Sequence, residues 1–201
     1  LDNLAATYNE LAQYDKAIPL QRRALKIREK AQGADHPETA ISLVNLAATY
    51  NELAQYDKAM PLQQRALEIR EKVLGPDHPD TALSLNNQAL TYNFLAKYEN
   101  ALPLQQRSLA ISEKVLGPDH PGTARSLHNL ALTYTNLAQY EEALPLARRA
   151  LTINEKTFGS DHPSIAVNFV HLAQIHSHLA QYDKTLLLQQ QALAIFEKEL
   201  G

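Results

Sequence analysis

The sequence predicts an all-α protein in which pairs of helices repeat along the chain, an α-solenoid of antiparallel helix hairpins. Two observations support this class. The tripeptide Asp-His-Pro recurs at intervals of 42 residues, at 35–37, 77–79, 119–121 and 161–163. Two successive 42-residue segments are identical at 28 of 42 aligned positions, which is the signature of a repeat architecture. We therefore expect a single array over 1–201, with a partial repeat and four complete ones at 1–33, 34–75, 76–117, 118–159 and 160–201.

The first half of each repeat has the pattern of a helix, as the repeat 76–117 illustrates. Asp77 offers hydrogen-bond acceptors to the free amides of a helix start, and Pro79 suits a first turn, where no amide donor is needed. Apolar side chains then recur at steps of three and four residues, which places them on one helical face: Ala82, Leu85, Ala89, Tyr92 and Ala96. We expect the first helix over 79–96.

The second half of the repeat predicts another helix. Pro103 lacks an amide hydrogen, so we expect it in the first turn of a helix that begins near Glu99. Gly117 followed by Pro118 ends the helix, because glycine accepts a left-handed backbone and proline cannot continue a helix. A single hairpin cannot bury its apolar face alone, whereas stacked hairpins can. Small residues at recurring positions would let the helices approach closely, for example Ala47, Ala59 and Ala66.

These residues resemble a known family. The run that includes Leu43, Leu46, Ala47 and Tyr50 is similar to the tetratricopeptide repeat pattern, although the repeat is longer than the usual length of about 34 residues. The segment 66–79 resembles the kinesin light chain subclass. The resemblance implies a right-handed superhelix whose first helices line a concave surface and whose second helices form the outside. It also implies a binding groove, which in kinesin light chains favours acidic peptides around an aromatic residue.

The resemblance points to a set of candidate binding residues. In this family an asparagine just before the Leu-Ala of the first helix faces the groove and bonds to the backbone of the ligand. The residues at that place are Asn3, Asn45, Asn87 and Asn129, with His171 fifth. An amide offers a donor and an acceptor together, as an extended peptide does. The alternative is that these asparagines tie neighbouring helices together or are merely solvated.

Further candidates lie on the same helices. A second set of amides follows six residues later and is expected to border the same face: Asn9, Asn51 and Asn93. Specificity should come from positions that differ between repeats, which include Asn86, Phe94, Arg125 and His128. Among these we expect Phe94 and Arg125 to be the main anchors, because aromatic residues and arginine dominate binding hot spots.

The composition argues against several classes of protein. A net charge of −3 provides no field for binding nucleic acid. No apolar run approaches the length that a bilayer requires, and residues 1–12 lack the features of a signal peptide. The absence of cysteine excludes disulfides and thiolate metal sites and fits a reducing compartment, so we expect a cytoplasmic protein that does not act at a membrane.

No catalytic or cofactor motif is evident. The sequence lacks a glycine-rich phosphate loop, a Gly-x-Ser-x-Gly motif and paired acids on one inward face. The histidines of the Asp-His-Pro tripeptides are expected to belong to helix starts rather than to a metal site. The basic residues within 22–30 are best read as a solvated outer face. We therefore expect no enzyme, no cofactor and no metal.

The sequence thus favours a protein–protein interaction scaffold that binds an extended peptide segment of a partner in its concave groove. Two alternatives stay open. The array can be a regulatory or oligomerising segment of a larger signalling protein or enzyme. Its ends can also stack on one another, which would give end-to-end self-association.

Overall fold

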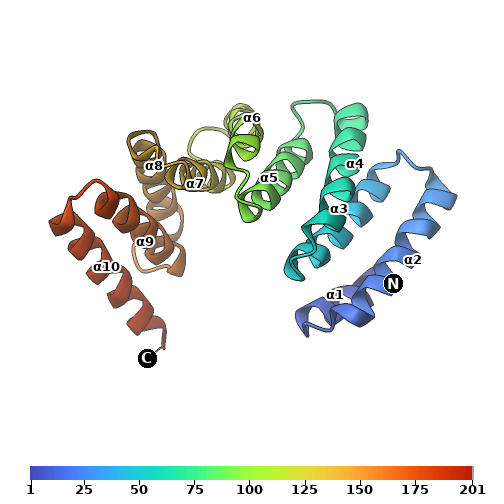
Figure 1. Cartoon of the computed structure of the whole chain (residues 1–201), viewed down its shortest axis with the longest axis horizontal. Helices are drawn as coiled ribbons and strands as arrows, with labels where there is room; N and C mark the ends of the chain where they lie inside the picture. Colours follow the sequence, from blue (N-terminus) through green and yellow to red (C-terminus); the bar gives the residue numbers. More distant parts are fainter. Residues whose placement is uncertain (201) are drawn as a thin grey trace. The chain divides into compact units, whose positions relative to one another are not determined.

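The computed structural model describes residues 1–200, and the side chains of residues 1–198. Within this part of the chain all regular structure is helical (Figure 1), so the predicted all-α class is confirmed. The helices are α1 Asp2–Glu10, α2 Tyr14–Gln32, α3 Pro37–Glu52, α4 Tyr56–Leu74, α5 Pro79–Phe94, α6 Tyr98–Leu116, α7 Pro121–Asn136, α8 Tyr140–Phe158, α9 Pro163–His178 and α10 Tyr182–Leu200. Odd numbers are the first helices of the hairpins and even numbers are the second helices.

The helices group into two compact units. The first unit, Leu1–Ala96, contains α1 to α5, and the second unit, Lys97–Gly201, contains α6 to α10. Their boundary lies in the turn between α5 and α6, inside the sequence repeat 76–117. The compact units therefore do not coincide with the sequence repeats.

Histidine caps the first helix of each complete repeat. His78 precedes α5, and its Nδ1 accepts a hydrogen bond from the backbone N–H of Asp80 at 3.1 Å. The same bond occurs at His36, His120 and His162. The prediction that Asp77 caps this helix is therefore wrong: the helix begins at Pro79, which places His78 at the capping position. The corresponding aspartates Asp35 and Asp161 instead bond to Lys72 and Lys198 of the second helices.

The proline of the second helix lies deeper in the helix than predicted. The helix α6 begins at Tyr98, one residue before the predicted start, so Pro103 falls in its second turn rather than its first. At that position the missing amide leaves the carbonyl of Glu99 without its helical partner. Three other second helices carry a proline at the equivalent place: Pro19, Pro61 and Pro145.

The core of each repeat combines large aliphatic residues with small residues at the helix contacts. Leu43 is fully buried and forms a cluster with Ala40, Ala66 and Ile69. Ala47 and Ala59, both fully buried, pack in a second cluster with Leu46 and Tyr50. The predicted small residues are therefore buried where the helices pack on one another.

Each hairpin turn contains an alanine in the left-handed region of backbone space. These alanines have φ between 52° and 58°, and they are Ala12, Ala54, Ala96, Ala138 and Ala180. At the end of α3, the N–H of Ala54 bonds to the carbonyl of Asn51 at 2.9 Å and the N–H of Gln55 bonds to the carbonyl of Tyr50 at 2.8 Å. This is the Schellman arrangement, which usually places glycine at the left-handed position. The alanine Cβ makes the turn strained, and it also ends α5 at Phe94, two residues before the prediction.

We expect Ala54→Gly to raise the free energy of unfolding by up to about 1 kcal/mol. Glycine removes the Cβ clash of the left-handed backbone, and its greater freedom in the unfolded chain offsets only part of this gain. The matched control is Ala48→Gly, an exposed position inside α3, which should lower stability by about 1 kcal/mol. Urea unfolding followed by circular dichroism measures both. If Ala54→Gly and Ala48→Gly lowered the free energy of unfolding equally, the backbone at Ala54 would not be strained.

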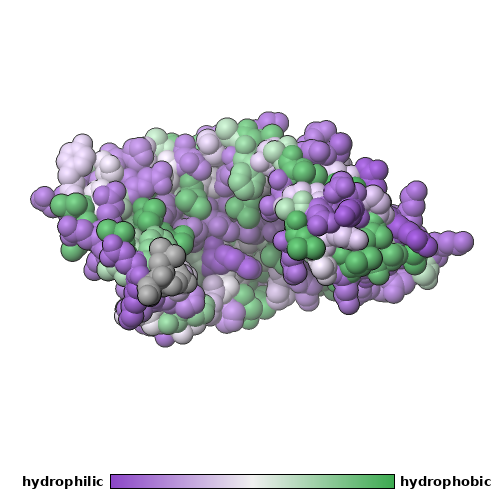
Figure 2. All heavy atoms as spheres, turned by 90° about the horizontal axis from the view of Figure 1, so that it is seen from below, coloured by the Kyte–Doolittle hydropathy of each residue, from purple (hydrophilic) through white to green (hydrophobic). Residues whose placement is uncertain are grey.

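The surface that faces the viewer in Figure 2 shows hydrophobic side chains as separate islands among hydrophilic ones. Among residues 1–200, no helix combines the length and the hydrophobicity that crossing a bilayer requires.

Candidate peptide-binding face

The first helices share an exposed stripe of side chains. In α3 the exposed residues are Ile41, Asn45, Ala48 and Glu52, whose steps of four, three and four residues place them on one helical face. The buried Leu43, Leu46 and Tyr50 lie on other faces of the same helix. We call these four positions and their equivalents in the other repeats the first-helix stripe. In α5 the equivalent positions are the half-buried Leu83, Asn87 and Leu90 and the exposed Phe94.

The predicted asparagine ladder lies on this stripe, but its members differ in accessibility. Asn3 and Asn45 are exposed, Asn87 is half-buried, and Asn129 is only 9% exposed. Asn45 lines a hollow of about 290 Å³ between α1 and α3. Within the described residues, the side-chain amides of Asn45 and Asn87 make no hydrogen bond. These two amides are therefore available to a ligand on neighbouring helices of the first unit.

The second set of amides forms ties between repeats. Asn51 Nδ2 and Gln63 Nε2 both donate to the hydroxyl of Thr91, each at 2.9 Å, and this hydroxyl donates to the carbonyl of Asn87 at 3.2 Å. The Thr91 hydroxyl thus uses both acceptor positions and its single donor. We call Asn51, Gln63 and Thr91 a junction triad. The same triad occurs one repeat earlier, formed by Asn9, Gln21 and Thr49.

The junction triad changes the interpretation of Asn51. Its Nδ2 is engaged by Thr91, and its Oδ1 is buried without a partner. Asn51 therefore connects α3 to α5, and its Nδ2 is already engaged within the protein. Asn93 occupies the equivalent place in α5, where it is half-buried.

The last repeat junction replaces the whole triad with a less polar set. Thr135, Ala147 and Ile175 stand at the positions of Asn51, Gln63 and Thr91. Ala147 and Ile175 are buried in a cluster with Ala131, Ala143 and Leu172. The hydroxyl of Thr135 donates to the carbonyl of Ala131 at 2.8 Å, and its oxygen also lies within hydrogen-bond distance of His171 Nε2, at 3.1 Å. The triad was not predicted from the sequence, although the repeats differ together at its three aligned positions.

A pair of histidines joins α7 to α9 in the second unit. His128 is half-buried, and its ring meets that of His171 edge-on, with centroids 5.1 Å apart. Burial, together with the neighbouring His128, lowers the pKa of His171 to about 4. Burial also lowers the pKa of His128. Because both rings are neutral at pH 7, they add no positive charge to this face.

The remaining predicted anchors are accessible to different degrees. Phe94 is 64% exposed and stacks on Tyr56 with ring centroids 5.7 Å apart. Arg125 is exposed on the stripe of α7 and has no ion-pair partner among the described residues. Asn86 is 7% exposed and lies beside the stripe rather than on it. Phe94 therefore shares the first unit with Asn45 and Asn87, whereas Arg125 belongs to the second unit.

The charge of the stripe in the first unit is negative. Glu10 and Glu52 are its charged members, and α1, α3 and α5 contribute no lysine or arginine to it. In the part of the chain that the structure describes, no group of three or more histidine, aspartate or glutamate side chains is placed to hold a metal ion. The stripe of the first unit therefore presents amides, apolar side chains and the carboxylates Glu10 and Glu52.

A protein built from repeated helix hairpins, with amides exposed along its first helices, is an α-solenoid of the helical-repeat class. Tetratricopeptide repeat models match residues 1–72, 44–102, 82–156 and 127–198, which together span nearly the whole sequence. The chain therefore belongs to the tetratricopeptide repeat family.

Solved structures agree with this assignment. The nearly identical TPR-like repeats assigned to a kinesin light chain of Podosopora anserina are 29% identical, with a TM-score of 0.83 over 98% of this chain and 94% of that chain. BtubC (BKLC) from P. vanneervenii is 23% identical, with a TM-score of 0.87 over 98% of this chain and 79% of its own. Apo RapI is 21% identical, with a TM-score of 0.86 over 98% and 69%. The last two show the fold alone. Among curated protein sequences, none matches this chain significantly.

Proposed function

We propose that this chain is a non-catalytic scaffold that binds an extended segment of a partner protein along the first-helix stripe of its first unit. The observation that carries this proposal is the state of two amides. Asn45 and Asn87 lie on neighbouring helices and make no hydrogen bond in the described structure, whereas the nearby Asn9 and Asn51 are engaged by threonines. A pair of unengaged amides on adjacent repeats can grip a peptide backbone at two points.

The surroundings of the two amides define the segment that would bind. Leu83, Leu90 and Phe94 flank Asn87 on the stripe of α5 and offer an apolar surface. Glu52 extends the stripe of α3 with negative charge, and no cation on this stripe balances it. We therefore propose a neutral or basic segment with at least one large apolar side chain. This differs from the acidic peptides that kinesin light chain grooves favour.

The test is the double variant Asn45→Ala with Asn87→Ala. Each lost amide removes a hydrogen bond to the ligand backbone, so we expect the Kd of a captured partner segment to rise about 10- to 100-fold, which corresponds to about 1–3 kcal/mol for two bonds. A pull-down identifies the partner, and calorimetry with its isolated segment measures the Kd. The thermal midpoint should not change, because neither amide is bonded within the protein.

The matched control is Asn100→Ala, an exposed amide on α6 that lies outside the stripe. It should bind the segment as the parent does. Suppose that the double variant binds the segment with unchanged affinity while Phe94→Ala abolishes binding. The proposed hydrogen bonds from the amides to the ligand backbone would then be wrong, and apolar contact alone would hold the ligand. If neither change affects binding, the stripe is not the binding face.

Membership of a larger regulatory or oligomerising protein, end-to-end self-association and a cytoplasmic location remain predictions from the sequence.

A further inference from the structure

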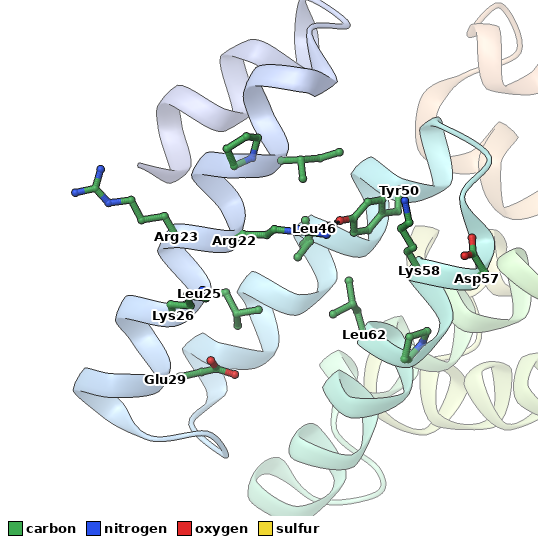
Figure 3. A pocket seen from close by; sticks show the side chains of 13 residues that line it. Arg22, Arg23, Leu25, Lys26, Glu29, Leu46, Tyr50, Asp57, Lys58 and Leu62 are labelled. Carbon is green, nitrogen blue, oxygen red and sulfur yellow. Dashed lines mark hydrogen bonds between the residues drawn. The ribbon is translucent and has the colours of Figure 1, made fainter.

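A second and larger hollow lies on the side of α3 opposite the first-helix stripe. It is bounded by the second helices α2 and α4, and its floor is formed by α3 (Figure 3). Its volume is about 910 Å³, and its lining belongs entirely to the first unit. The lining on α2 runs from Ile18 to Glu29, a length of about 16 Å at 1.5 Å per helical residue. A side chain or a short helix of a partner can therefore lie between α2 and α4.

The floor of this hollow is apolar. Ile18 and Leu25 of α2 and Leu62 of α4 are half-buried, and Leu46 of α3 lies beneath them. In Figure 3 the side chains of Leu25, Leu46 and Leu62 converge on the space between the helices. Covering such a surface with apolar side chains of a ligand removes it from water and favours binding.

The hollow carries two cations without carboxylate partners. Arg22 Nε and Nη2 donate to the hydroxyl of Tyr50 at 3.1 Å and 2.6 Å. Lys58 Nζ lies 5.6 Å from the centre of the Tyr50 ring. Figure 3 shows both side chains directed toward this tyrosine. Lys58 Nζ also donates to Gln55 Oε1 at 2.8 Å. Arg22 and Lys58 are therefore held by neutral groups, which leave their charge uncompensated.

Further positive charge surrounds the hollow. Arg23 and Lys26 are exposed on α2, and in Figure 3 Arg23 extends away from the hollow into solvent. The lining contains two acidic residues, Glu29 and Asp57, and Glu29 is paired with Arg65 at 2.7 Å. Asp57 is then the one unpaired negative charge in the lining, compared with four positive charges. The field at the mouth of the hollow is therefore positive, although the whole chain has a net charge of −3.

The other repeats show that this positive charge is not required by the fold. The second helices α6 and α8 carry similar apolar residues at the positions that form the floor. The positions equivalent to Arg22, Arg23, Lys26 and Lys58 are there occupied by Gln106, Arg107, Ala110 and Glu142. Glu68 stands at the position of Lys26 one repeat later. Three of the four positions thus carry neutral or acidic residues on the same backbone, and only the position of Arg23 stays cationic, so packing does not explain Arg22, Lys26 and Lys58. A ligand of opposite charge does.

We propose that this hollow is a second docking surface, which binds an acidic amphipathic helix of a partner protein. A helix of about three turns matches the length of the lining and would place leucine-sized side chains on the floor. Its carboxylates would pair with Arg22 and Lys58 at one side and face Lys26 at the other. This surface goes beyond the function proposed above, because it lies on a different face of α3 and selects the opposite charge.

The experiment uses the full chain and a fluorescent 14-residue helical peptide with leucines at steps of three and four residues and glutamates on the opposite face. Lys26→Glu with Lys58→Glu is the test variant, because both glutamates already occur at equivalent positions and are compatible with folding. We expect the Kd of the peptide to rise at least about tenfold, with weaker dependence on salt. The Asn45/Asn87 double variant should bind the peptide as the parent does.

The control variant Lys156→Glu with Lys184→Glu makes the same change in net charge on the second unit and should leave the affinity within about twofold, since neither lysine lines the hollow. Equal loss in the control and test variants would overturn the proposal, since it would reveal a general charge effect. The proposal would also be overturned if a peptide with its leucines distributed around the helix bound as tightly as the amphipathic peptide. Binding of vesicles rich in phosphatidylserine in place of the peptide would identify a membrane surface and overturn it as well.

Discussion

Replacing Thr91 by isoleucine, the residue at the equivalent position of the last repeat, is expected to lower the free energy of unfolding by about 2–5 kcal/mol. The Thr91 hydroxyl accepts hydrogen bonds from Asn51 and from the buried Gln63. Isoleucine removes the acceptor, so the buried Gln63 amide keeps only its longer bond to the carbonyl of Asn87 at 3.4 Å, and the half-buried Asn51 amide loses its partner. Each unsatisfied buried group costs about 1–3 kcal/mol. Urea unfolding, with hydrogen exchange of the α3 and α5 amides, measures the loss and its location.

The matching triple variant should recover most of that stability. Asn51→Thr, Gln63→Ala and Thr91→Ile together reproduce the set that the last junction uses, formed by Thr135, Ala147 and Ile175. When both sides of a hydrogen bond become apolar, no donor is stranded, and the exchange is nearly neutral. The three sites therefore couple strongly rather than adding. If the triple variant were no more stable than Thr91→Ile, the three residues would not be energetically coupled as proposed.

Acid is expected to destabilise the second unit through His171. Burial, together with His128, holds the pKa of His171 at about 4 in the folded protein, compared with about 6.5 in an unfolded chain. The unfolded chain therefore binds more protons between these values. The contribution to stability is complete above pH 6.5 and is lost as the pH falls toward 4, where it levels off. The loss is about 2 kcal/mol at pH 5 and about 3 kcal/mol at full protonation.

The substitution His171→Asn isolates this effect, because asparagine stands at the equivalent positions 45, 87 and 129. The parent should lose about 2 kcal/mol more than the variant between pH 7 and pH 5, as measured by urea unfolding at each pH. Burial also lowers the pKa values of His128 and His176, so part of the acid sensitivity should remain in the variant and become smaller when His128→Val is added. Valine is the residue at the equivalent positions 44 and 170. Identical losses in parent and variant would show that His171 is accessible to protons in the folded state.

Local patterns were sufficient to predict the hairpins. The spacing of Ala82, Leu85 and Ala89 marks one face of a helix in any context, and Gly117 with Pro118 stops a helix for reasons of backbone geometry alone. The errors arose where two local candidates competed. Asp77 and His78 can both accept a hydrogen bond at a helix start, and only the register of the helix decides that His78 takes the capping position.

The candidate site could be predicted only in part, because two asparagines of the same helix have different partners. Asn45 and Asn51 are both amides on α3, six residues apart. The next first helix, α5, places the hydroxyl of Thr91 within hydrogen-bond distance of the Asn51 amide. Within the described part of the chain, no group of α5 bonds to the Asn45 amide. The sequence of one repeat contains no information about this difference, since it depends on which face the neighbouring repeat covers. The same reason explains why the junction triad was not foreseen.

By itself, the sequence determined the helical class, the length of the repeat and the set of amides and anchors from which a binding face can be made, because each of these follows from periodicity along one chain. Tertiary structure decided which amides have partners within the protein and how far burial lowers the pKa of His171. It also decided that the cations Arg22 and Lys58 both contact Tyr50 beside an apolar hollow. These properties depend on distances between residues of different helices. Such distances are set when one hairpin packs on the next.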